Sequence, residues 1–287
     1  MKPSPFGYRL AESLQHALEL HSESAGDAIW LAGGHSVVPS LALRLQAPAV
    51  LVDISRLPEL SGITYDHCGL RIGALTRHAE ILSHPLVASH APMLAEAARF
   101  VAHPAIRNRA TFGGNLALAD PASEFPAVVR CLGAVFDIVG PEGEREVSAE
   151  DFFLDLYTTA IEPGEILRSI LIPPAPLGTL TAFDELARRH GDFAMVGTAV
   201  RIVPRAGAIE DVGICFHSVG ATPMRARAAE ELLRGRPLDR AAIRSAQEAL
   251  SLDLDPMDDP TLSGATRLHL ARVLLGRILA RLAEQMD

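Results

Sequence analysis

Two glycine pairs constrain the fold of this chain more than any other feature. Residues 32–36 read Ala-Gly-Gly-His-Ser, and residues 111–115 read Thr-Phe-Gly-Gly-Asn. The first pair follows the apolar run Ile29–Leu31 and precedes apolar-periodic residues through Leu45, which predicts a turn between a strand and a helix. Adjacent glycines can adopt φ > 0, so that successive N–H groups form a concave anion site at a helix start. We therefore expect bare backbone at both segments to approach one phosphate-bearing cofactor, as in a flavin site.

The first pair does not fit the two common nucleotide motifs. It lacks the G-x-G-x-x-G pattern of dinucleotide-binding folds and the Gly-Lys-Ser/Thr ending of a P-loop. Either segment taken alone is equally compatible with an ordinary tight turn. The occurrence of both in one chain is what favours the cofactor site.

Composition excludes several classes of function. The 287 residues are 48% hydrophobic, enough for two or three domains with substantial cores. The net charge is −9, and no stretch concentrates arginine, which argues against nucleic acid as a main partner. The only lysine is Lys2, so a Schiff-base or P-loop lysine is not expected.

The cysteines and histidines predict no metal on this chain. Cys68, Cys131 and Cys215 form no C-x-x-C, and they cannot supply a four-thiolate iron–sulfur cluster or a disulfide framework. The histidines show no H-E-x-x-H or comparable spacing. No apolar run approaches about 18 residues, and the first residues do not resemble a signal peptide, so we expect a cytoplasmic protein.

Hydrophobic patterns divide the chain into three parts. Residues 1–55 predict a small α/β unit, and residues 56–176 predict a second unit with alternating short strands and helices. The prolines of 173–176 mark a linker. Residues 177–287 predict an antiparallel sheet followed, after Arg225, by helices, which is an α+β arrangement.

Several residues have ordinary structural interpretations. Asp120 before Pro121 is typical of a helix N-cap, and an acidic Glu124 one turn later is explained by the helix dipole. His35 and Ser36 are not expected to form a catalytic pair, because neighbouring side chains on a tight turn diverge.

Two further features have simple alternatives. The arginines in 107–109 are compatible with a solvated loop or with docking to a partner chain. The helical pattern of Leu268, Ala271, Leu275 and Ile278 has the spacing of a core face.

The chain resembles the FAD-binding (medium) subunits of molybdenum hydroxylases, the group that contains carbon monoxide and xanthine dehydrogenases. The order, spacing and length agree over nearly the whole chain. The segments that carry the resemblance are Ala32–Ser36, Ile72–Thr76 with His78–Glu80, Arg107–Arg109 with Thr111–Asn115, Ala119–Pro121, Glu162–Glu165, and Ala187–Arg189 with Gly191–Phe193.

This resemblance implies a two-part FAD-binding domain of the vanillyl-alcohol-oxidase type and a small α+β C-terminal domain. It places the pyrophosphate on the first glycine segment, further cofactor contacts on the second, and Phe193 beside the isoalloxazine. Asp184 departs from a basic residue found there in some relatives. The cofactor-binding residues that it implies are Ala32, Gly33, Gly34, His35, Ser36, Thr111, Phe112, Gly113, Gly114, Asn115, Glu124, Leu167, Asp184 and Phe193.

The function that the resemblance implies is electron transfer. A [2Fe-2S] subunit would deliver electrons from a molybdopterin subunit that hydroxylates the substrate, within a heterotrimer or its dimer. The FAD subunit would pass them to an external acceptor such as quinone, NAD or oxygen. The alternatives are a self-contained flavin oxidase or reductase of the same fold, and a flavin-free interaction module.

Relatives similar to 4-hydroxybenzoyl-CoA reductase carry an additional cluster that three scattered cysteines cannot hold. The substrate, whether carbon monoxide, a purine, an N-heterocycle or an aldehyde, stays open.

Overall fold

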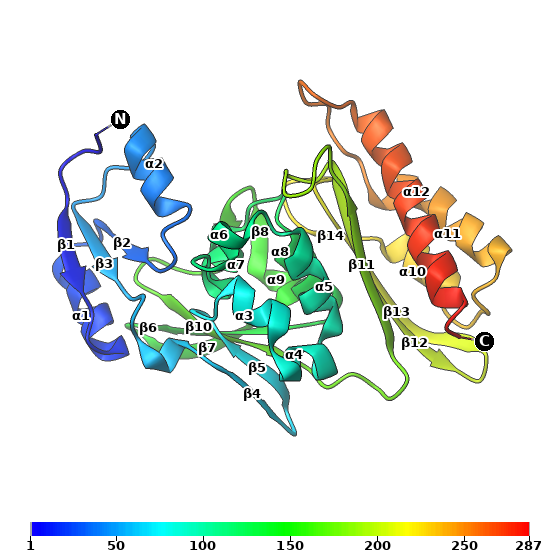
Figure 1. Ribbon diagram of the computed structural model, residues 1–287, viewed down its shortest axis with the longest axis horizontal. Coiled ribbons are helices and arrows are strands. Elements are labelled where there is room, and N and C mark those ends of the chain that lie inside the picture. The colour runs from blue at the N-terminus through cyan, green and yellow to red at the C-terminus, as the bar shows by residue number, and fades with distance from the viewer. Residues whose placement is uncertain (1, 287) are drawn as a thin grey trace.

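Three main sheets follow one another along the long axis of the molecule (Figure 1). The computed structural model describes residues 2–286, with the first sheet at one end and the C-terminal helices at the other. The sheets occupy residues 7–53, 63–172 and 180–225. Helices combined with largely antiparallel strands confirm the α+β class. The boundaries expected near residues 55 and 176 stay predictions.

The first sheet is parallel and has the strand order β1-β3-β2. The sequence predicted its strands near 29–31 and 50–53 and a helix after the first glycine pair, and all three are present. Its core is shared with the second sheet, because Val139 and Ile166 pack in the same cluster as Val52 and Leu60. The elements of this unit are β1 (Gly7–Leu10), α1 (Leu14–Glu23), β2 (Ala28–Leu31), α2 (Val37–Leu43), β3 (Val50–Asp53) and η1 (Pro58–Leu60).

The second sheet is antiparallel, with the order β4-β5-β10-β6-β7, and helices cover one of its faces (Figure 1). Its strands are β4 (Ile63–Asp66), β5 (Gly69–Gly73), β6 (Val135–Gly140), β7 (Gly143–Ser148) and β10 (Ile166–Ile172). The other elements are α3 (His78–Ser83), α4 (Pro85–His90), α5 (Pro92–Phe100), α6 (Pro104–Arg107), α7 (Phe112–Leu118), α8 (Glu124–Cys131), α9 (Ala149–Phe152), β8 (Phe153–Asp155) and β9 (Thr158–Thr159). Alternate residues of the sheet, such as Ile72, Phe136 and Ile170, are buried beneath these helices.

The third sheet lies between two layers of helices. Its inner face packs on α5 and α8, and its outer face packs on the C-terminal helices. Ala271, Leu275 and Ile278, which the sequence predicted to face a core, are at most 1% exposed there. The elements are β11 (Leu180–Leu186), β12 (Val196–Arg205), β13 (Ala208–His217), β14 (Met224–Arg225), α10 (Arg227–Leu233), α11 (Arg240–Asp253) and α12 (Gly264–Ala283).

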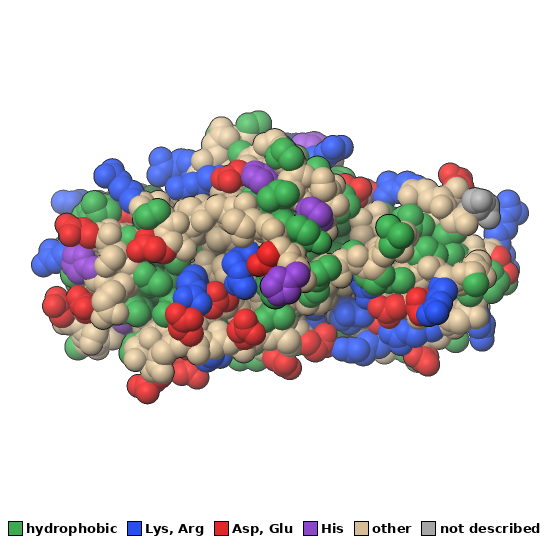
Figure 2. Space-filling model, turned by 90° about the horizontal axis from the view of Figure 1, so that it is seen from below, with side chains coloured by type: hydrophobic (Ala, Val, Ile, Leu, Met, Phe, Trp, Pro, Cys, Tyr) green, Lys and Arg blue, Asp and Glu red, His purple; other side chains and the backbone are tan. Residues whose placement is uncertain are grey.

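The surface seen from below carries mixed charge. Figure 2 shows acidic and basic side chains interspersed on this face, with no basic stripe. Within residues 2–286, no helix is both long enough and apolar enough to cross a bilayer.

The helix expected from Pro121 begins three residues later, so the N-cap prediction for Asp120 was wrong. Asp120 Oδ1 accepts a hydrogen bond from the Ala122 N–H at 2.9 Å, and α8 begins at Glu124. An aspartate that bonds its own backbone two residues ahead closes a turn and delays the helix.

Gly113 allows α7 to approach the end of β5, and adding a side chain there should destabilise the fold. A Cβ on Gly113 would meet Ala74, including its Cα at 2.7 Å, so backbone would have to move. We expect Gly113→Ala to lower the free energy of unfolding by about 1–3 kcal/mol in urea titrations. Gly7→Ala is the control, because a Cβ there makes only ordinary contacts at 3.5 and 3.6 Å. Equal stability of the two variants would contradict this packing.

Candidate functional site

A cavity of about 690 Å³ lies where the first unit, the helical layer and the loop before β12 meet. Its wall combines the first glycine turn with the start of α7, the N-terminal residues of α8 and the beginning of β10. This volume lies within the range of roughly 300–1,000 Å³ seen for ligand and cofactor sites. The cavity brings together most of the residues that the sequence singled out.

The first glycine turn offers unpaired backbone N–H groups to this cavity. Gly34 adopts φ +78°, and the turn continues directly into α2. The N–H groups of residues 33–36 find no protein acceptor within residues 2–286. Successive free N–H groups on a concave turn form an anion site. This turn therefore has the geometry that a pyrophosphate requires.

Close packing joins the two glycine segments. A Cβ on Gly33 would lie 2.5 Å from the Arg109 carbonyl oxygen and 3.1 Å from Ala110 Cα. A Cβ on Gly114 would lie 2.6 Å from Thr111 Oγ1 and 4.0 Å from Ala32 Cβ. The segments are far apart in sequence but adjacent in space, because neither glycine has a side chain in the way.

The second glycine segment differs from the turn that the sequence predicted. Thr111 caps α7, and Gly113 and Gly114 lie in its first turn without positive φ. The Gly113 N–H donates to the Ala74 carbonyl at 2.8 Å, the Gly114 N–H to Thr111 Oγ1 at 3.2 Å, and the Asn115 N–H to the Thr111 carbonyl at 3.0 Å. Since these backbone N–H groups already donate to acceptors within the protein, this segment contributes packing surface and side chains to the cavity wall. It does not form a second anion site.

Two expected site residues lie outside the cavity wall. Phe112 is fully buried and packs edge-on against Phe125, with ring centroids 5.2 Å apart. Asp184 lies on β11, where its Oδ1 accepts a hydrogen bond from the Glu185 N–H at 2.9 Å. The expected residues that do line the cavity are Ala32, Gly33, Gly34, His35, Ser36, Thr111, Gly113, Gly114, Asn115, Glu124, Leu167 and Phe193. Phe193 is 74% exposed.

The wall contains polar residues that the sequence did not single out for the site. Ser123 Oγ donates to Asn115 Oδ1 at 2.9 Å, which leaves the Asn115 NH2 group for a ligand. His78 is buried in the wall and packs edge-on against Phe125. The sequence signal for His78 was its place in the segment His78–Glu80, one of those that carry the family resemblance.

Burial controls the charge of the titratable wall residues. It raises the pKa of Glu124 to about 7 and lowers the pKa of His78 to about 4. The pKa of His35 is lowered by burial and then by Arg109 and Arg77. At neutral pH both histidines are uncharged, whereas Glu124 lies near its midpoint.

A second cavity, of about 560 Å³, lies on the open face of the second sheet. Its charged side chains bind each other: Arg168 contacts Asp137 at 2.8 Å and Glu144 at 2.6 Å. Arg71 and Arg145 of this cavity are also paired with carboxylates, so among the described residues its arginines leave no free cation for an anionic ligand.

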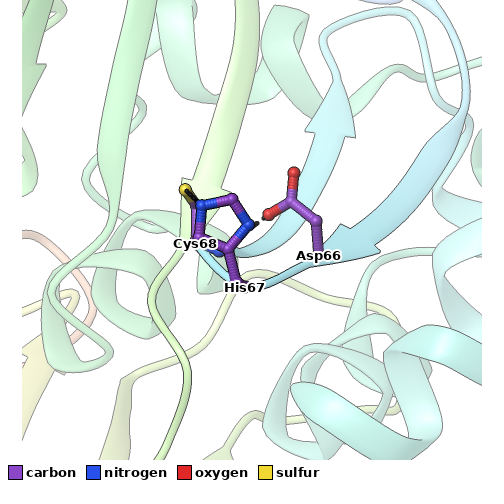
Figure 3. A group of neighbouring side chains, drawn as sticks. All are labelled: Asp66, His67 and Cys68. Atoms are coloured by element: carbon purple, nitrogen blue, oxygen red, sulfur yellow. Dashed lines mark hydrogen bonds between the residues drawn. The ribbon is translucent and has the colours of Figure 1, made fainter.

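Asp66, His67 and Cys68 form a third group, at the turn between β4 and β5 (Figure 3). Their potential ligand atoms lie within 4.8 Å of one another, and all three residues are exposed. The Cys68 N–H donates to Asp66 Oδ1 at 2.8 Å, a turn hydrogen bond that accounts for the arrangement. None of the three lines the large cavity.

Comparison with known proteins agrees with this geometry. Residues 4–175 match the FAD binding domain in molybdopterin dehydrogenase, and residues 181–282 match the CO dehydrogenase flavoprotein C-terminal domain. This chain belongs to the family of FAD-binding medium subunits of molybdenum hydroxylases. It is therefore a flavoprotein subunit of an oxidoreductase, as the sequence predicted.

Relatives match the chain along its whole length. The alpha subunit of the 6-hydroxypseudooxynicotine dehydrogenase complex of Paenarthrobacter nicotinovorans is 38% identical over 98% of this chain and 95% of its own. A carbon monoxide dehydrogenase structure from Hydrogenophaga pseudoflava matches with TM-score 0.93 and 36% identity over 96% of both chains. Quinoline 2-oxidoreductase from Pseudomonas putida 86 matches with TM-score 0.95 and 35% identity over 100% of both chains.

Burial of Glu124 should make stability depend on pH. Its pKa is about 7 in the folded chain against an ordinary 4.5, so the folded chain binds this proton more tightly than the unfolded chain does. The stabilisation of the folded chain by this proton is complete below pH 4.5 and is lost as the pH rises through 7. Glu124→Gln, which stays neutral, should therefore gain up to about 3 kcal/mol relative to the parent chain between pH 5 and about 8.5.

Thermal melts of the flavin-free chain across this pH range provide the measurement. Glu248→Gln is the control, because Glu248 is exposed on α11. If the two variants depend on pH in the same way, Glu124 does not have the raised pKa.

Proposed function

We propose that this chain binds one FAD noncovalently in the 690 Å³ cavity and acts as the electron-transfer subunit of a molybdenum hydroxylase complex. The observation that carries the proposal is the row of unpaired N–H groups at residues 33–36, facing a cavity large enough for a cofactor. A pyrophosphate would bind these groups, while Asn115, Ser123 and Glu124 would contact other polar atoms of the cofactor. Phe193, exposed at the edge of the cavity, would lie beside the ring system.

Bound FAD supplies the ability to take up electrons singly and release them in pairs. The protein's own part is to bind and orient the cofactor and to shield it from water. The helix start and its free N–H groups hold the negative charge, and the apolar wall residues Leu75, Ile106 and Leu167 exclude water from one side of the cavity.

The cysteines support a separate iron–sulfur subunit as electron donor. Cys131 and Cys215 are fully buried, and burial raises both pKa values, that of Cys131 to about 12. The Cys131 thiol lies 3.3 Å from the Gly213 carbonyl oxygen, to which it donates. Cluster ligands are thiolates, whereas these groups stay protonated. We propose that a [2Fe-2S] subunit and a molybdopterin subunit complete the complex, as a heterotrimer or its dimer.

The substrate is set outside this chain. The relatives described above carry the names of three different substrates at similar identity to this chain. The external acceptor and the cytoplasmic location expected from the sequence stay predictions.

A self-contained flavin oxidase is the second candidate, and Glu124 is the observation that favours it. A buried carboxyl with a pKa of about 7 on the cavity wall could serve as an acid or base toward a substrate. Anaerobic addition of substrate decides between the two. The co-expressed complex should lose its oxidised-flavin absorbance and the lone chain should keep it. Bleaching of the lone chain by the same substrate would establish the oxidase instead.

Gly33 offers a direct test of the cofactor site. In Gly33→Ala, the new Cβ meets the Arg109 carbonyl and separates the two segments that form the wall. We expect FAD affinity to fall by about tenfold or more, a loss of at least about 1.4 kcal/mol in binding free energy. Flavin-fluorescence titrations of the flavin-free chain with FAD measure this affinity. Gly7→Ala should bind FAD as the parent does. Circular dichroism checks that both variants fold, and unchanged affinity in a folded Gly33→Ala would refute the assignment.

A further inference from the structure

A row of three residues crosses the third sheet behind the cavity. Glu185 on β11 pairs with Gly197 on β12, and Gly197 pairs with His217 on β13. Phe183 lies two residues before Glu185 on β11. Phe183 and its cross-strand neighbours belong to the core that the sheet shares with α8. Because side chains two residues apart share a face, Glu185 and His217 both point toward the helical layer.

The missing side chain of Gly197 brings Glu185 and His217 together. A Cβ on Gly197 would fall on the His217 ring, with Cε1 only 2.6 Å away. The imidazole therefore lies across the middle strand and stacks on Phe183, with ring centroids 5.7 Å apart and planes at 5°. Its Nε2 atom lies 3.8 Å from Glu185 Oε2.

The Glu185–His217 pair is buried, and its two facing atoms have no other partner among the described residues. The Glu185 side chain is 3% exposed and that of His217 is 0% exposed. Within residues 2–286, neither Glu185 Oε2 nor His217 Nε2 has a hydrogen-bond partner. Burial raises the pKa of Glu185 to about 8 and lowers the pKa of His217 to about 3. At neutral pH the proton belongs to the carboxyl, so this is a neutral acid beside a neutral imidazole.

Glu124 links the pair to the cavity. It lines the cavity wall at the start of α8, and the Ser218 N–H, next to His217, donates to the Pro121 carbonyl at 2.8 Å, which brings the end of β13 to the turn before α8. After burial, Glu124 is the largest influence on the pKa of Glu185, followed by Asp184. The charged and titratable groups close to Glu185 are Glu124 at the start of α8, Asp184 on β11 and His217 on β13. Glu96 on α5 reaches the same strand, and Asp120, in the turn before α8, acts on Glu124. Glu96 Oε2 accepts the Phe183 N–H at 2.9 Å.

No cation balances these carboxyls. Among the described residues, neither Glu124 nor Glu185 forms an ion pair with arginine, although most other buried acids of this chain do, such as Glu230 with Arg225 at 2.6 Å. Negative charge that arrives in the cavity therefore meets, at Glu124 and Glu185, carboxyl groups with no cation beside them, and proton uptake by these groups compensates part of that charge.

We propose that Glu124 and Glu185, with the His217 imidazole packed beside Glu185, form a proton-uptake site coupled to reduction of the cofactor in the cavity. This inference rests on the proposed function. Electrons come from the partner subunit, protons come from solvent, and each proton converts one carboxylate into a carboxylic acid. No other bond forms or breaks at these residues, and reoxidation returns the protons to solvent.

The proposal predicts how the flavin midpoint potential depends on pH. Above neutral pH the oxidised state leaves Glu185 progressively ionised, and reduction then requires it to take up a proton. The potential of the parent chain should fall more steeply with rising pH than that of Glu185→Gln, which has no proton to exchange at position 185. The two curves should coincide near pH 6 and diverge above about pH 7, with the parent lower.

Spectroelectrochemical titration of the FAD-loaded complex from about pH 6 to 9.5 makes this measurement. Glu210→Gln, an exposed position of β13, is the control and should follow the parent. Parallel curves for the parent and Glu185→Gln would overturn the inference. If the parent complex contains no flavin, the proposed function fails as well, so flavin content separates the two failures.

An infrared measurement tests the parent without any variant. At pH about 9, the reduced-minus-oxidised difference spectrum should gain a carboxylic acid C=O band, because Glu185 becomes protonated on reduction. This band should be smaller in Glu185→Gln, where only Glu124 remains to be protonated, and unchanged in Glu210→Gln. Absence of the band from the flavin-loaded parent would equally overturn the inference.

Discussion

The close approach of Gly33 to the Arg109 carbonyl is the contact on which the site depends. It lets the first α/β unit sit against the helical layer of the second, with only 2.5 Å between a notional Cβ and that oxygen. Any side chain at Gly33 would separate the free N–H groups of residues 33–36 from the wall formed by α7. Backbone contact thus places the anion site, while the shared core of Val139, Ile166 and Leu60 holds the two units in this relation.

A second constraint is the unequal distribution of charge around the cavity. The free N–H groups of residues 33–36 lie near Arg77 and Arg109, which lower the pKa of His35, whereas Glu124 on the wall and the neighbouring Glu185 have no arginine partner among the described residues. Burying an unpaired carboxyl shifts its pKa toward the neutral form. One cavity therefore combines a turn with free N–H groups and a wall carboxyl whose pKa is about 7, an arrangement that suits a cofactor whose charge changes with its redox state.

Local patterns predicted much of the fold. The apolar residues at 29–31 and 50–53 became β2 and β3, and the spacing of Ala271, Leu275 and Ile278 identified the buried face of α12. These predictions succeeded because burial of one face follows from the periodicity of a single element. Asp120 was misjudged because an aspartate can bond the backbone of a turn as well as that of a helix start, and sequence does not distinguish the two.

The sequence by itself determined the family, through motifs spread along the whole chain, and the position of the turn at residues 32–36, because adjacent glycines can adopt the positive φ that such a turn requires. Tertiary structure decided what the second glycine pair does. Gly113 lets α7 approach Ala74 closely, Gly114 leaves room for the capping Thr111 hydroxyl, and neither glycine has positive φ. It also decided that Glu185 meets His217 across Gly197. Both depend on contacts between segments distant in the chain, which no local pattern encodes.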